Sequence, residues 1–141
     1  MTLQSELNHV TDLVISRRRE LADAELRRLT AKRAADLAAE ELETARRQLM
    51  TRAEAGSNDV QRRAYAERES RRERDHADRE VDDLLAAEAA VIRATVELRM
   101  AEDERRYLEF VARLAIVGVN DEATDDSGER YTLADANRDM F

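Results

Sequence analysis

The feature that most constrains this chain is a long stretch without a helix breaker. Residues 3–54 contain neither glycine nor proline, and alanine, leucine, arginine and glutamate dominate them. These residue types lose little side-chain freedom on entering a helix. The whole chain lacks proline and is 40% charged, whereas globular proteins average about 25% charged residues. The sequence therefore predicts one long helix over about residues 3–54.

A heptad repeat runs along this predicted helix. Fourteen positions that alternate in steps of four and three carry an apolar residue at all but two places. They are Leu3, Leu7, Val10, Val14, Arg17, Leu21, Ala24, Arg28, Ala31, Ala35, Ala38, Leu42, Ala45 and Leu49. Such a repeat sustained over about six heptads is typical of a coiled coil.

The first break is followed by a second long segment. Gly56 can adopt the left-handed conformation that ends many helices, and Asn58 with Gln61 has the spacing of a capping box. A second breaker-free segment then predicts a helix over about residues 59–117, ending before Gly118. The two predicted helices make the fold all-α. Because a short loop favours antiparallel neighbours, we expect residues 1–118 to form a two-helix coiled-coil hairpin in which residue i lies opposite residue 113 minus i.

The second helix carries two apolar lines, which is more than one partner helix requires. The heptad line comprises Leu84, Ala87, Val91, Ala94, Leu98, Ala101, Arg105, Leu108, Ala112 and Ala115. The eleven-residue line comprises Val81, Leu85, Ala89, Ile92, Val96, Met100, Asp103, Tyr107, Val111 and Leu114. The extra apolar width predicts assembly of hairpins into an oligomeric helical bundle. The candidate oligomer interface consists of Leu84, Val91, Leu98, Leu108, Val111 and Leu114.

The remaining segment, residues 119–141, is an acidic linker followed by a predicted short C-terminal helix. It holds seven acids and two arginines, so it contributes −5 to the net charge of −8. Its end, Asp139, Met140 and Phe141, resembles the acidic C-terminal tips of single-stranded-DNA-binding proteins. That resemblance implies a tail whose terminal phenylalanine docks into a partner, and a frayed chain end is the alternative.

A second resemblance covers more of the chain. The stretch NDVQRRAYAERES at residues 58–70, DH at 75–76 and ATVELRMAE at 94–102 resemble segments of small helical bacteriophage proteins encoded in early or recombination regions. This resemblance implies an accessory protein that acts near single-stranded DNA or a host DNA-processing complex.

One segment of the first helix is rich in positive charge. At 100° per residue, five basic side chains fall within about 160° of arc. They are Arg17, Arg18, Arg28, Lys32 and Arg33. This face is a candidate contact for single-stranded DNA or another anionic partner, and a solvated coiled-coil flank is the alternative.

The sequence offers little for catalysis or for cofactor binding. The chain has no cysteine, and the pairs Glu6–His9 and Glu73–His76 would lie about 50 Å apart along the hairpin, so we expect no metal site and no cofactor. It also lacks a glycine-rich phosphate loop and a nucleophile motif, so we expect no enzyme and no small-molecule substrate. No segment is apolar enough to cross a membrane or to act as a signal peptide, and we expect a cytoplasmic protein.

The sequence therefore favours a non-enzymatic, oligomeric coiled-coil interaction protein, in the manner of a phage accessory factor that binds macromolecular partners. We expect a homo-oligomer and a protein partner. One alternative is a DNA recombination or repair accessory that binds single-stranded DNA through the basic face and recruits a partner through the acidic tail. Another is a capsid scaffolding protein, although that class usually has a basic C-terminal helix.

Overall fold

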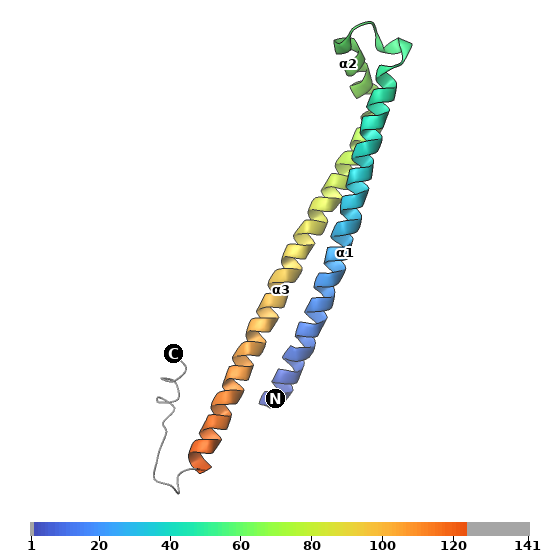
Figure 1. Cartoon of the computed structure of the whole chain (residues 1–141). Coiled ribbons are helices and arrows are strands. Elements are labelled where there is room, and N and C mark those ends of the chain that lie inside the picture. Colours follow the sequence, from blue (N-terminus) through green and yellow to red (C-terminus); the bar gives the residue numbers. More distant parts are fainter. Residues whose placement is uncertain (1, 124–141) are drawn as a thin grey trace. The chain divides into compact units, whose positions relative to one another are not determined.

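The computed structural model describes residues 2–123, with side chains as far as residue 118. Within this range the chain is helical apart from turns. It contains α1 (Leu3–Met50), the 3-10 turn η1 (Ala53–Ala55), α2 (Asp59–Glu69) and α3 (Arg71–Ala123), as Figure 1 shows. The prediction of an all-helical fold with two long helices that pack together is confirmed.

The chain divides into two compact units. Among the described residues, unit 1 joins the start of α1, residues 2–18, to the later part of α3, residues 96–123, and unit 2 comprises residues 19–95. In each unit α1 and α3 lie side by side and run in opposite directions (Figure 1).

The predicted heptad seam of α1 is the buried face of this helix. All fourteen seam positions are buried or half-buried. Only five other residues of α1 are shielded to this degree, namely Glu6, Leu13, Ala34, Arg46 and Met50. The four-three spacing therefore identified the packing face along the whole helix, including the two positions occupied by arginine.

The turn between α1 and α2 follows the predicted chemistry with one local difference. Gly56 has φ +109°, which L side chains rarely adopt. The side chain of Asn58 accepts a hydrogen bond from the backbone N–H of Gln61 at 2.9 Å and so caps α2. The Gln61 side chain accepts from the backbone of Ser57 at 3.2 Å, one residue before the partner of a standard capping box.

The end of α1 differs from the predicted boundary at residue 54. The helix ends at Met50, because the next two backbone N–H groups bond three residues back instead of four. Thr51 donates to the Gln48 carbonyl at 3.3 Å, and Arg52 donates to the Leu49 carbonyl at 3.2 Å. These tighter bonds satisfy carbonyls at the helix end and lead into η1.

The predicted single helix over residues 59–117 is interrupted at Ser70, which separates α2 from α3. Ser70 has φ −95° and ψ 17°, away from helical values, and its side chain is fully buried. The Glu67 carbonyl at this break accepts from Arg74 Nη2 at 2.7 Å and from Ser70 Oγ at 3.5 Å. Side chains thus satisfy a backbone acceptor at the interruption.

The second helix also extends beyond its predicted end before Gly118. α3 continues to Ala123, because Gly118 lacks the positive φ that ends a helix in a left-handed cap. Residues 119–123 of the predicted acidic linker therefore belong to α3. The predicted short helix and the rest of the tail lie outside the described residues.

The buried core of each unit is thin. In unit 1 the buried apolar side chains are Val10, Val14 and Ala101. In unit 2 they are Leu49 and seven alanines, namely Ala24, Ala35, Ala38, Ala55, Ala66, Ala77 and Ala94. Only three apolar side chains larger than alanine are therefore buried in the part of the chain whose side chains the structure describes.

Candidate interaction surfaces

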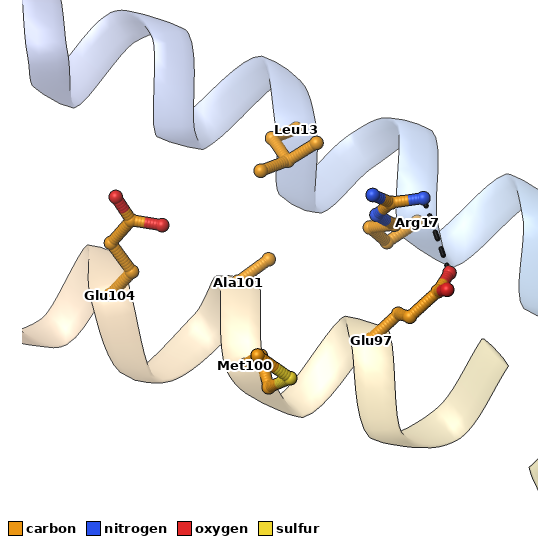
Figure 2. Close-up of a pocket in the computed structure, with 6 residues that line it drawn as sticks. All are labelled: Leu13, Arg17, Glu97, Met100, Ala101 and Glu104. Atoms are coloured by element: carbon orange, nitrogen blue, oxygen red, sulfur yellow. Dashed lines mark hydrogen bonds and ion pairs between the residues drawn. The ribbon is translucent and has the colours of Figure 1, made fainter. Parts of the chain in front are cut away.

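The pairing of α1 with α3 in unit 1 fixes which side chains meet. Arg17 Nη1 lies 3.2 Å from Glu97 Oε2, and these residue numbers add to 114, one more than the predicted 113. Leu13 and Ala101, whose numbers also add to 114, line one pocket. Figure 2 shows them pointing toward each other between the helices, beside the Arg17–Glu97 ion pair. The predicted antiparallel register is thus confirmed within one residue for unit 1.

Unit 2 has the same pairing. Glu73 of α3 and Glu40 and Glu41 of α1 line one pocket, and their numbers add to 113 and 114. The second Glu-x-x-His pair begins at Glu73, and Nδ1 of His76 lies 3.9 Å from Glu80 Oε1. Among the described residues, no three His, Cys, Asp or Glu side chains gather closely enough to hold a metal ion.

The structure does not leave the five basic residues as one open surface. In unit 1, Arg17 pairs with Glu97, and Arg18 Nη2 lies 3.7 Å from Glu102 Oε1. The carboxylates of α3 thus partly neutralise this end of the predicted DNA contact.

The other three basic residues belong to unit 2. Arg28 is half-buried at its seam position, whereas Lys32 and Arg33 are exposed. Two basic side chains of the candidate face are therefore open to solvent.

The six residues predicted to form the oligomer interface are all half-buried within the hairpin. Leu84, Val91, Leu98 and Leu108 follow the heptad line, in which Ala94 and Ala101 are buried. Leu108 lines a pocket together with Val10 of α1. The heptad line of α3 is therefore the face that packs within the hairpin, and Val111 and Leu114 are also partly shielded.

The eleven-residue line of α3 behaves differently from the heptad line. Eight of its ten residues are exposed, all except Val111 and Leu114. The large apolar side chains among them are Val81, Leu85 and Ile92 in unit 2 and Val96, Met100 and Tyr107 in unit 1. The eleven-residue line was evident in the sequence, but of its members only Val111 and Leu114 belong to the predicted oligomer interface.

The Glu6–His9 pair belongs to unit 1. His9 is exposed, and together with Glu6 it lines a pocket with Glu104, Tyr107 and Leu108. The candidate docking tail, Asp139, Met140 and Phe141, lies outside the described residues.

Comparison with known proteins adds no relative to this picture. No protein family matches the chain, and no curated protein or solved structure is significantly similar to it. Within residues 2–123, no helix is both long and apolar enough to span a membrane.

Proposed function

We propose that this chain is a non-enzymatic helical interaction protein that acts as a homo-oligomer and binds macromolecular partners. The observation that supports the proposal is the contrast between its core and its surface. The core is mostly alanine, whereas α3 exposes Ile92, Met100 and Tyr107 to solvent. Large apolar side chains arranged along one helix are typical of a surface that another helix covers.

The energetics support the same conclusion. Burying a large aliphatic side chain contributes about 1.5–3 kcal/mol, whereas fixing each residue's backbone costs about 1–2 kcal/mol. Val10, Val14 and Leu49 are the buried apolar side chains larger than alanine in the described part of the chain. A hairpin with so few has little apolar stabilisation of its own, and association supplies more.

The DNA-accessory alternative ranks below this proposal. Its candidate face would need free cations, but Arg17 and Arg18 pair with glutamates of α3. Lys32 and Arg33 are exposed and keep the alternative testable. It predicts binding to a fluorescently labelled single strand that weakens steeply with added salt and strengthens when residues 124–141 are removed.

Measuring the mass of the purified chain tests the proposal directly. Light scattering coupled to gel filtration should give at least twice the monomer mass of 16.1 kDa across low-micromolar to high-micromolar concentration. A monomer throughout this range contradicts self-association. The labelled single strand added to the same samples separates the two functions: binding by a monomeric chain supports the DNA alternative.

A further inference from the structure

Unit 1 has two unlike sides. At 100° per residue, Gln4, Asn8, Thr11 and Arg18 of α1 share one side of the seam. Gln4 donates to Asn8 Oδ1 at 3.1 Å, and Arg18 pairs with Glu102 of α3. The residues of α3 on the same side are Arg99, Glu102, Arg106, Glu109, Arg113 and Ile116. We call this side the polar face of unit 1.

The opposite side of the seam is the apolar face of unit 1. It carries Leu13 of α1 with Met100 and Tyr107 of α3, and the last two are 66% and 65% exposed. Two pockets among the described residues of unit 1 open on this side. One is lined by Leu13, Arg17, Glu97, Met100, Ala101 and Glu104 (Figure 2), and the other by Glu6, His9, Val10, Glu104, Tyr107 and Leu108.

We infer that the apolar face of unit 1 packs against the same face of a second copy, with a two-fold axis parallel to the helices. α1 of each copy then lies against α3 of the other, and the contact is an antiparallel four-helix bundle. This inference rests on the proposed self-association and specifies the surface that carries it.

The symmetry gives a definite set of contacts. A two-fold axis parallel to the helices leaves every residue at its own height along the bundle. Within one chain, Leu13 lies at the height of Met100 and Ala101. Because heights are kept and α1 of one copy lies against α3 of the other, Leu13 also meets Met100 of the second copy. The two exposed apolar side chains of α3 are then covered by α1 of the neighbour.

The charged groups of this face are complementary under the same operation. Arg17 stands at the height of Glu97, and their numbers add to 114, so the Arg17 of one copy approaches the Glu97 of the other. His9 shares a pocket with Glu104 and Tyr107, which places an imidazole of one copy near a carboxylate of the next. A basic group on α1 thus meets an acidic group on α3 twice in each half of the interface.

This complementarity favours a second copy over an unrelated helix as the partner of the apolar face. On this face α1 supplies Arg17 and His9, and α3 supplies Glu97, Glu104 and the large apolar groups, so each helix matches the other helix of an identical chain. Glu6 of α1, which lines the same pocket as His9, stands at the height of Leu108 instead of a carboxylate. The polar face offers no comparable match, because its apolar members Ile15 and Ile116 lie near opposite ends of unit 1 in the observed register.

A matched pair of substitutions tests the surface. Met100→Glu places a charge in the proposed contact, whereas Ile116→Glu places it on the polar face at a similarly exposed site, 62% against 66%. Because a buried unpaired charge is costly, we expect Met100→Glu to weaken dimerisation about tenfold or more. Ile116→Glu should change the dissociation constant, measured by sedimentation equilibrium, less than about threefold.

Cysteine crosslinking locates the contact between the two copies without introducing a charge into it. The chain has no cysteine, so single-cysteine variants form disulfides only between chains. A mixture of Leu13→Cys and Met100→Cys chains should yield a mixed disulfide dimer under mild oxidation. The matched mixture of Asn8→Cys and Arg106→Cys, at the same height on the polar face, should yield little.

The outcomes separate this inference from the proposed function. A monomeric wild-type chain overturns both. An oligomer that resists Met100→Glu and gives no mixed Leu13–Met100 disulfide overturns the assigned surface while self-association stands. Loss of dimer by both glutamate variants, together with crosslinking by both cysteine mixtures, also overturns the assignment.

Discussion

Replacing either of two glycines with alanine should change the free energy of unfolding, in opposite directions, because the two glycines lie in different environments. At Gly56, φ is +109°, and a Cβ atom would lie 2.6 Å from Gln61 Oε1 and 2.8 Å from Gln61 Cβ. Gly118 lies within α3, lacks a positive φ, and has open space where a Cβ would project. Alanine is therefore strained at the first position and fits at the second.

The expected magnitudes follow from these geometries. Forcing an L-residue into the left-handed half of backbone space costs about 1–2 kcal/mol. Displacing Gln61 also removes its hydrogen bond from Ser57, which contributes about 0.5–1.5 kcal/mol. Gly56→Ala should thus lower the free energy of unfolding by about 2–3 kcal/mol. Gly118→Ala should raise it by up to about 1 kcal/mol, the difference in helix propensity.

Urea unfolding followed by far-ultraviolet circular dichroism measures both effects. Wild type and variants are compared at one protein concentration, because association makes the unfolding midpoint depend on concentration. A Gly56→Ala chain as stable as wild type would refute the strained turn. A destabilising Gly118→Ala would mean that Gly118 caps a helix instead of lying within α3.

Substitutions at three further sites, two of them with a matched control, test the core, the cap and the helix break by the same unfolding assay. Val14→Ala should lower the free energy of unfolding by about 2 kcal/mol, because Val14 is fully buried. Ile15→Ala, at a 44% exposed site, should lower it by less than about 0.5 kcal/mol. Equal losses would contradict the burial of the heptad seam at Val14. Asn58→Ala should cost about 1 kcal/mol through loss of the α2 cap, and Ser57→Ala, whose backbone alone bonds to Gln61, should be near neutral. Ser70→Leu should cost about 1–3 kcal/mol because the fully buried site has no room for the larger side chain, and an unchanged midpoint would show that the junction repacks freely.

The sequence predicts the parts of this fold that depend on local pattern. The heptad positions of α1 are shielded without exception, because a repeat of 3.5 residues keeps one face toward a partner helix. The turn at Gly56 was predictable because glycine and asparagine are the residues that such a turn requires. The register followed from the position of that turn.

The features that the sequence did not predict depend on tertiary contacts. Ser70 is an ordinary residue within a charged segment, and nothing in that segment marks its full burial. Gly118 is compatible both with a helix end and with a helix interior, and the backbone conformation decides between them. The prediction of the oligomer interface rests on apolar character, which does not distinguish a side chain packed within the hairpin from one that faces outward.

The two apolar lines of α3 show why that distinction needs the structure. A heptad repeat advances about 103° per residue and an eleven-residue repeat about 98°, so the lines separate by about 50° every eleven residues. Because the heptad line stays against α1, the eleven-residue line winds around α3 along the helix. It turns first away from α1 and then back toward it. The exposure pattern agrees, because Ile92, Met100 and Tyr107 are exposed whereas Val111 is half-buried.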